Sequence, residues 1–261
     1  MRKKILVTGA DGQLGKTIKE LYSNNNLELD FIFVGKTELD ITNQNKVDTY
    51  FHNNKFDYCI NCAAYTNVEQ AEKTPKVAYK INAEGVMNLA HKCLENDIVL
   101  IHISTDYVFD GEKEEPYTIN DITNPINEYG KSKLEGEKHI QQILAKYFII
   151  RTSWLYSKKY GNNFYKFIVN KANTVKELSI TTEQTGCPTD TVSLSSYIIN
   201  LIDKNDKSFG LYHFCDKKAM TWYAFAKQIL LENNLNHKTN LIKTDNYRTF
   251  ARRPKNSVLA N

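Results

Sequence analysis

Tyr129 and Lys133, four residues apart, are the pair in this sequence whose side chains could carry out acid/base chemistry together. They follow Pro125 and an expected turn at Asn127, in a segment that predicts a helix, where this spacing puts both side chains on one face. A free phenol has a pKa near ~10, and a neighbouring ammonium favours the phenolate. We therefore expect Lys133 to lower the pKa of Tyr129, so that the phenol acts as a general acid or base. For an isolated pair, the alternative is a surface tyrosine beside a solvated lysine.

A glycine-rich segment follows the first apolar run of the chain. Residues 4–8 predict a strand, residues 16–24 predict a helix, and between them lies the turn Gly9-Ala10-Asp11-Gly12-Gln13-Leu14-Gly15. Glycines in such a turn let the backbone approach a pyrophosphate, whose charge the amides at the helix start can bind. Strand, glycine loop and helix in this order predict a dinucleotide site.

The second predicted strand, residues 28–34, ends where a dinucleotide-binding protein reads the adenine ribose. An acidic residue there selects NAD, whereas this chain has Gly35-Lys36-Thr37, and Lys36 could pair with a 2′-phosphate. NADPH is therefore the favoured cofactor, with NADH as the alternative. Asp40 and Ile41 follow and could meet the adenine edge, although a helix cap for residues 43–53 is an equally natural role here.

Two further strands lead into small or hydroxyl-bearing residues. Residues 57–61 run into Cys62-Ala63-Ala64-Tyr65-Thr66, which would leave room for a cofactor, and residues 98–103 run into Ser104-Thr105-Asp106. A hydroxyl just beyond the carboxyl end of a parallel strand lies where open α/β sheets bind ligands. Asn82 lies inside a predicted helix over residues 75–95. Because asparagine is a poor helix-interior residue, it has a hydrogen-bonding role that is either structural or functional.

Strands that alternate with helices predict an α/β fold with a doubly wound, parallel, Rossmann-like sheet. We expect residues 1–155, with a fifth strand at 147–152, to form an NAD(P)-binding domain, and residues 156–261 to form mostly a smaller substrate-binding lobe. Helices at 158–176 and 221–234 and short strands at 178–181 and 211–214 suggest that lobe. The chain is expected to return to the first domain within residues 183–210.

The composition argues against several classes of protein. The 261 residues carry a net charge of only +4, which does not predict nucleic-acid binding. No apolar run reaches the roughly 18 residues of a membrane span and the start is unlike a signal peptide, so we expect a cytoplasmic protein. The five cysteines do not suggest a disulfide scaffold. We interpret Cys59 and Cys62 as small buried hydrophobes, and the spacing of the histidines predicts no metal site.

The glycine loop, Ser104-Thr105 and Tyr129-x-x-x-Lys133, in this order, resemble the extended short-chain dehydrogenases/reductases. More narrowly, the chain resembles the dTDP-4-dehydrorhamnose reductases nearly end to end. That family reduces the 4-keto group of dTDP-4-dehydro-L-rhamnose with NADPH or NADH, giving dTDP-L-rhamnose for cell-surface polysaccharide. The narrower resemblance is carried by Gly12-Gln13-Leu14-Gly15, Asn61 to Glu69, Ser104 to Gly111, Arg151 to Tyr156, Gly161-Asn162-Asn163-Phe164 and Arg252 to Ser257.

This resemblance implies a role for each motif residue. Tyr129 would protonate the C4 oxygen, Lys133 would also hold the nicotinamide ribose hydroxyls, and Thr105 would donate a hydrogen bond to the developing alkoxide. Asp106 and Trp154 would contact the sugar, and Arg253 the diphosphate. The residues expected around the cofactor, besides Tyr129 and Lys133, are Gly9, Asp11, Gly12, Gln13, Leu14, Lys36, Asp40, Ile41, Ala63, Ala64, Tyr65 and Asn82.

The sequence also departs from that family at two places. The chain stops at Asn261, where members usually continue through a further helical segment, so we expect a lobe that is incomplete or completed by a partner. Gly35-Lys36 stands where relatives often have an acidic residue, which leaves the choice of cofactor open. Two alternatives therefore stay open: an epimerase or dehydratase of another nucleotide sugar, and a regulatory subunit resembling that of methionine adenosyltransferase. A homodimer is one possibility for the assembly.

Overall fold

The computed structural model describes residues 2–24, 28–216, 218–245 and 247–260, so Asn261, at the end of the predicted lobe, lies outside the described residues. Its centre is a six-stranded sheet in the order β10-β5-β4-β3-β1-β2, in which every pair of neighbours is parallel. The predicted α/β fold with a doubly wound parallel sheet is confirmed. The strands are β1 (Lys3–Thr8), β2 (Leu29–Val34), β3 (Tyr58–Asn61), β4 (Val99–Thr105), β5 (Tyr147–Thr152) and β10 (Gly210–His213).

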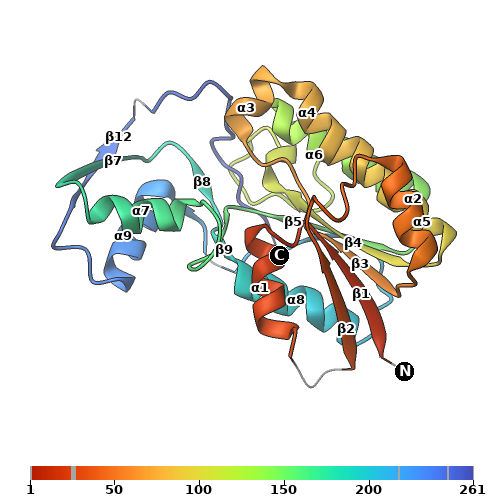
Figure 1. The fold of residues 1–261 in the computed structure, drawn as a ribbon. Helices are drawn as coiled ribbons and strands as arrows, with labels where there is room; N and C mark the ends of the chain where they lie inside the picture. Colours follow the sequence, from red (N-terminus) through yellow and green to blue (C-terminus); the bar gives the residue numbers. More distant parts are fainter. Residues whose placement is uncertain (1, 25–27, 217, 246, 261) are drawn as a thin grey trace.

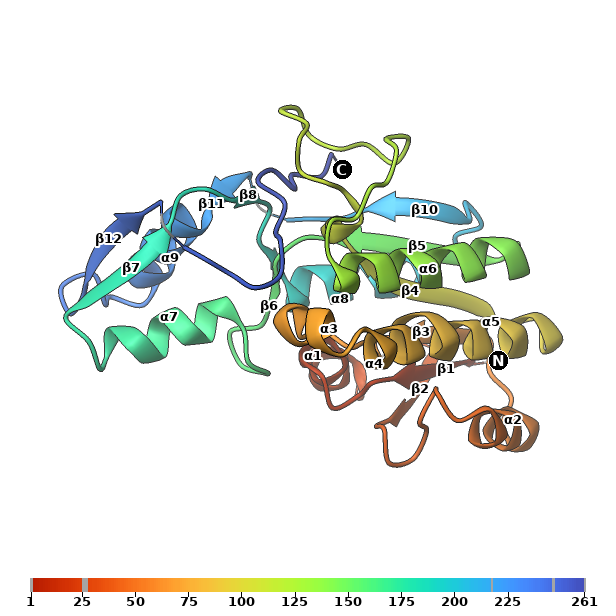
Figure 2. The same ribbon diagram turned by 90° about the horizontal axis from the view of Figure 1, so that it is seen from above.

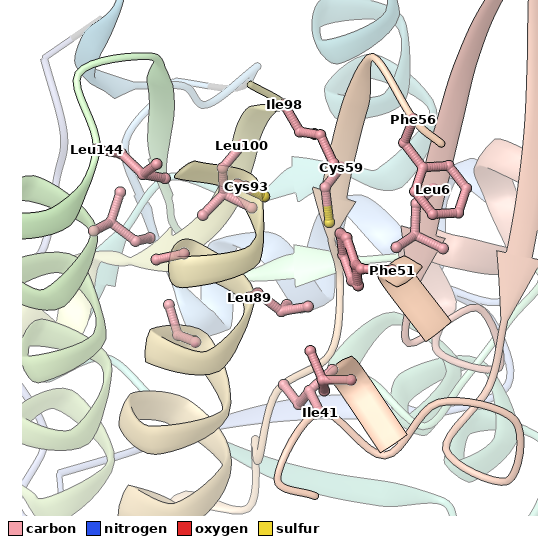
Figure 3. Packing of buried hydrophobic residues seen from close by; sticks show 14 of the residues in the cluster. Leu6, Ile41, Phe51, Phe56, Cys59, Leu89, Cys93, Ile98, Leu100 and Leu144 are labelled. Carbon is pink, nitrogen blue, oxygen red and sulfur yellow. The ribbon is translucent and has the colours of Figure 1, made fainter. Parts of the chain in front are cut away.

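Helices cover both faces of this sheet (Figures 1 and 2). One face is covered by α1 (Gln13–Tyr22) and α8 (Thr191–Asp203), and the other by α2 (Gln44–Asn53), α5 (Gly85–Glu95) and α6 (Glu128–Ile143). The inner strands β3 and β4 are buried on both faces, which is why their apolar residues are consecutive rather than alternating. Figure 3 shows Leu89 and Cys93 of α5 among the side chains packed with Cys59 of β3 and Leu100 of β4.

Two elements from the second half of the chain lie in the sheet domain. Helix α8 packs against α1, where Thr17 Oγ1 donates to Thr191 Oγ1 at 2.9 Å. Strand β10 pairs with β5 in parallel register. The strand expected near 211–214 is therefore present, but its assignment to the lobe was wrong, because an apolar run of four residues does not identify its partner. We propose a cofactor domain of residues 1–155 joined by residues 191–213.

The lobe lies to one side of the sheet domain (Figure 2). It has a small hydrophobic core of its own. Helices α7 (Phe164–Ala172) and α9 (Trp222–Glu232) pack with the parallel pair β7 (Glu177–Thr181) and β12 (Asn240–Thr244). Helix α7 begins later than the predicted residue 158, because Gly161 has a φ of +71° and Asn163 caps the first turn by accepting from Lys166 N. Two shorter pairs join this region to the sheet: β6 (Leu155–Tyr156) with β9 (Thr189–Asp190), and β8 (Thr185–Gly186) with β11 (Met220–Thr221).

The long helix expected over residues 75–95 is present but irregular. It runs as α4 (Pro75–Tyr79), a π-helical turn η1 (Lys80–Glu84) and α5, after a short helix α3 (Val68–Lys73). Asn82 lies in this π-helical turn, a type of irregularity that is frequent at functional sites. In the parts of the chain that the structure describes, every helix is too short or too polar to cross a bilayer.

Two glycines let α6 approach its neighbours at van der Waals distance. A Cβ at Gly136 would lie 2.1 Å from the carbonyl oxygen of Asn82, and a Cβ at Gly130 would lie 2.1 Å from that of Tyr107. Asn127 caps the helix by accepting from Gly130 N. The same helix carries Tyr129 and Lys133. The close packing at the two glycines therefore sets the distance of these two residues from the sheet.

We expect Gly136→Ala to lower the free energy of unfolding by about 1–3 kcal/mol, as overpacking does. Alanine favours helix over glycine by about 1 kcal/mol, but the added methyl group must push α6 away from the π-helical turn. Urea unfolding measures the difference. Lys138→Ala, on the exposed side of the same helix, is the control and should stay within about 0.5 kcal/mol of the wild type. Equal stability of Gly136→Ala and the wild type would contradict the close approach.

Candidate functional site

A cleft of about 550 Å³ opens at the carboxyl ends of β3 and β4, between the sheet and the lobe. A second hollow of about 210 Å³ continues from it toward the end of β2. Such a position, outside the carboxyl ends of parallel strands, is where doubly wound sheets bind ligands. The expected site residues that line the cleft are Gly12, Gln13, Leu14, Ala63, Ala64, Thr105, Asp106, Tyr129, Lys133, Trp154 and Arg253. Those that line the hollow are Gly9, Asp11, Gly12, Lys36, Asp40, Ile41, Ala63 and Ala64.

The glycine loop leaves room for a ligand at the start of α1. Gly9 has a φ of +62°, and a Cβ there would lie 2.5 Å from the backbone nitrogen of Ala63. The N-cap position of α1 is Gly12, so the first amides of this helix have no side-chain cap. The residues present therefore fit a pyrophosphate. The side chain of Gln13 bonds to the protein instead of being free for a ligand. Its Nε2 donates to the carbonyl of Leu155 (3.0 Å) and its Oε1 accepts from Asn163 (3.0 Å), so Gln13 ties α1 to the lobe.

The part of the hollow beyond the end of β2 is lined by one lysine, Lys36, and two aspartates, Asp11 and Asp40. Lys36 is exposed and lines the hollow. A Cβ at Gly35 would lie 2.1 Å from Oδ2 of Asp11, so this carboxylate occupies the space beside Gly35. Asp40 does not cap α2, since Asn43 does so by accepting from Lys46 N. The Asp40 carboxylate instead accepts from the backbone and hydroxyl of Thr42 (3.0 and 2.8 Å).

Tyr65 and Asn82 line neither the cleft nor the hollow. Asn82 is fully buried; its Oδ1 accepts from Tyr65 N (2.8 Å), and its Nδ2 donates to the carbonyl of Tyr65 (3.0 Å) and to Ser132 Oγ (3.0 Å). A contact between Asn82 and the cofactor stays a prediction, and in this structure its amide is engaged by Tyr65 and Ser132. It holds the segment after β3 against α6, which positions Ala63 and Ala64.

Tyr129, Thr105 and Asp106 meet on the wall beside β4. The hydroxyl of Thr105 donates to Oδ1 of Asp106 (3.0 Å) and accepts from Tyr107 N (3.1 Å). Asp106 is 2% exposed and its Oδ2 accepts from Ser153 (2.8 Å). Burial raises the pKa of Asp106 to about 6, against the hydrogen bonds from Ser257, Ser153 and Thr105 that lower it. Asp106 therefore orients the hydroxyl of Thr105 on this wall.

The protonation of Tyr129 differs from the sequence-based expectation. Burial raises the pKa of Tyr129 well above its ordinary value, and a hydrogen bond with Thr105 only partly opposes this. Lys133, which is 1% exposed, donates from Nζ to the carbonyl of Ile103 (2.7 Å) and lies 3.1 Å from Nε2 of His102. The prediction that Lys133 lowers the pKa of Tyr129 is therefore wrong in this arrangement, because the amine is directed at β4.

A buried ion pair supports this wall. Arg151 donates from Nε and Nη2 to Glu137 (3.0 and 2.7 Å), and Ser104 Oγ also donates to this carboxylate. The side chains of the two charged residues are 4% and 1% exposed. Glu137 lies one turn beyond Lys133 on α6, and Ser104 lies two residues beyond His102 on β4. Side chains one turn apart on α6, Lys133 and Glu137, thus each contact a residue of β4.

The lobe contributes an aromatic wall. Trp154 has a φ of +47°, a conformation that bulky residues rarely adopt. Its ring stacks on that of Trp222 with centroids 3.4 Å apart, and a Cβ at Gly186 would lie 2.4 Å from it. The sequence analysis missed Trp222, which lines the cleft. Trp222 is the first residue of a helix far along the chain from the predicted site residues around it. Cys62, in the segment expected to leave room for a cofactor, also lines the cleft.

Arg253 is held across the cleft from the lobe. Its Nη2 donates to Glu69 Oε1 (2.8 Å), and Glu69 Oε2 also accepts from the backbone of Phe250 (2.9 Å) and Ala251 (3.1 Å). Glu69 belongs to α3, so this carboxylate ties the C-terminal segment to the sheet domain. Arg253 also lines a third cavity of about 340 Å³ in the lobe.

Comparison with known proteins identifies the family. The family model described as the RmlD substrate binding domain matches residues 2–261. A dTDP-4-dehydrorhamnose reductase of Aggregatibacter actinomycetemcomitans is 39% identical, and the match covers 98% of this chain and 90% of that protein. This chain belongs to the dTDP-4-dehydrorhamnose reductase family. The resemblance indicated by its motifs is confirmed, and the chain is an oxidoreductase by family.

Solved structures of this reductase family have the same fold. The dTDP-4-dehydrorhamnose reductase of Bacillus anthracis str. Ames, solved in complex with NADP, is 39% identical with a TM-score of 0.95, covering 100% of this chain and 91% of its own. The Clostridium acetobutylicum ATCC 824 reductase ortholog is 42% identical with a TM-score of 0.92, covering 99% and 90%. These two reductases therefore share the Rossmann-like architecture of this chain.

We expect Glu137→Ala to destabilise this reductase by roughly 3–5 kcal/mol, because it leaves the buried guanidinium of Arg151 without its partner. Urea unfolding followed by circular dichroism measures the change. Glu135→Ala is the matched control on the same helix, since the Glu135 side chain is 40% exposed and surface changes stay within about 0.5 kcal/mol. A loss as small as that of the control would show that the ion pair is dispensable.

Proposed function

We propose that this chain reduces the 4-keto group of dTDP-4-dehydro-L-rhamnose to dTDP-L-rhamnose with NADPH, for cell-surface polysaccharide. The observation that carries the proposal is the meeting of Thr105, Tyr129 and Lys133 beside one cleft, in a chain of this reductase family. The epimerase, dehydratase and regulatory-subunit alternatives receive no comparable support. A cytoplasmic location and a homodimer stay predictions.

Each catalytic side chain has a distinct task in this proposal. NADPH, when bound, supplies the hydride that reaches the carbonyl carbon. Tyr129 gives its phenolic proton to the carbonyl oxygen, and its raised pKa keeps that proton in place at neutral pH. Thr105 stabilises the developing negative charge once its hydroxyl turns from Asp106 toward the substrate oxygen. Lys133 holds the ribose hydroxyls when it turns into the cleft.

The cofactor is proposed to lie from the hollow near β2 to the main cleft. Gly9, Gly12 and the uncapped start of α1 would hold the pyrophosphate, and Ala63 and Ala64 would flank the middle of the molecule. Lys36 would face a 2′-phosphate, whereas the nearby Asp11 carboxylate could accept ribose hydroxyls. We therefore propose that this end of the hollow binds NADPH and can also bind NADH.

The substrate is proposed to enter along Arg253. This residue lines both the main cleft and the lobe cavity, where Phe164, Phe167 and Tyr247 offer aromatic surface for a nucleobase. The diphosphate would then meet Arg253, and the sugar would reach Asp106 and Trp154 near the catalytic residues. A dTDP-sugar fits this order of base, diphosphate and sugar.

We expect Tyr129→Phe to lower kcat for NADPH oxidation by roughly 10²–10⁴-fold, because the general acid is removed. The assay uses enzymatically generated dTDP-4-dehydro-L-rhamnose and follows NADPH absorbance. Tyr79→Phe, the same change on α4 away from the cleft, should leave turnover unaltered. Undiminished turnover in Tyr129→Phe would refute the proposed mechanism.

Lys36→Ala is expected to reduce kcat/KM for NADPH about tenfold, by loss of a charge-assisted contact to the 2′-phosphate, while kcat/KM for NADH stays constant. The matched control is Lys46→Ala, an exposed lysine that likewise acts on Asp40 but does not line the hollow. Equal effects of Lys36→Ala on both cofactors would assign Lys36 no role in cofactor choice.

A further inference from the structure

His102 is a fully buried histidine on β4 that lies between Asn61 and Lys133. Its Nδ1 is 3.0 Å from Nδ2 of Asn61, and its Nε2 is 3.1 Å from Nζ of Lys133. A neutral imidazole carries one ring proton, so one nitrogen donates and the other accepts. The position of that proton decides which protonation state of Lys133 fits beside the ring.

The amide of Asn61 fixes the position of this proton. Its Oδ1 lies 3.1 Å from the backbone N–H of Ala63 and 2.7 Å from the hydroxyl of Thr8. A backbone N–H can only donate, so the oxygen must face Ala63 and the NH₂ group must face His102. Nδ1 of His102 therefore accepts, and the ring proton is on Nε2, directed at Lys133.

An N–H on Nε2 opposes an ammonium on Lys133, because both groups would donate. A neutral amine accepts the Nε2 proton and still donates to the carbonyl of Ile103 at 2.7 Å. Burial acts in the same direction and lowers the pKa of Lys133 to about 8. Two other groups that face Lys133 favour its charged form: Glu137 on α6 and the thiol of Cys62 after β3.

We propose that His102 is a positioning residue of this site: Asn61 holds its ring proton on Nε2, and the ring then favours the neutral form of Lys133 over the ammonium while the lysine lies against β4. Asn61, His102 and Lys133 come from β3, β4 and α6, so three elements of the sheet domain set this state. Its importance for turnover rests on the proposed function. The tautomer itself rests on hydrogen-bonding geometry alone.

NMR of the purified full chain without added cofactor tests the proposal, with ¹⁵N-labelled histidine and ¹³Cε-labelled lysine. The signals are assigned by their loss in His102→Leu and Lys133→Arg. We expect an Nε2–H ring and a Lys133 titration midpoint near pH 8. His102→Leu removes the opposing N–H and should raise that midpoint by about one pH unit or more. His213→Leu removes a buried ring from β10 and should leave the midpoint in place.

Asn61→Asp provides a second test that does not depend on the folding of His102→Leu. Its carboxylate still accepts from Ala63 and Thr8 but also accepts from the ring, so the proton should move to Nδ1. An Nδ1–H ring in the wild type, or an unchanged Lys133 midpoint in His102→Leu, would overturn the proposal. Because neither readout uses turnover, failure of this proposal and failure of the reductase assay are distinguishable.

Discussion

Helix α6 lies so close to β4 that successive turns of the helix meet alternate residues of the strand. Lys133 meets His102, and one turn further Glu137 meets Ser104 and the neighbouring Arg151. The rest of the site depends on this contact, because the helix that it fixes also carries Tyr129, one turn before Lys133, beside the end of β4.

Burial is the main influence on the charges at this wall. It raises the pKa of Asp106 and Tyr129 and lowers that of Lys133, so each of these groups moves toward its neutral form. Neutral groups need matched donors and acceptors, since an unmatched polar atom is costly where water is excluded. The hydrogen-bond pattern around the cleft therefore controls the position of each proton.

The cleft has its shape because the lobe is tied to the sheet domain on both sides. Gln13 of α1 bonds to Leu155 and Asn163, and Glu69 of α3 holds the segment that carries Arg253. The stacked rings of Trp154 and Trp222 close the side that faces the lobe. Groups from distant parts of the chain thus surround one space at the ends of the strands.

Local patterns in the sequence determined the sheet, the glycine loop and the helix that carries Tyr129 and Lys133, because periodicity, capping and spacing act over a few residues. Tertiary structure alone decided that β10 joins the main sheet, that Asn82 braces the backbone of Tyr65, and that Lys133 faces His102. It also decided the direction in which the pKa of Tyr129 shifts. A pKa and a hydrogen-bond partner depend on which atoms surround a group in space, and the spacing of residues along the chain does not contain that information.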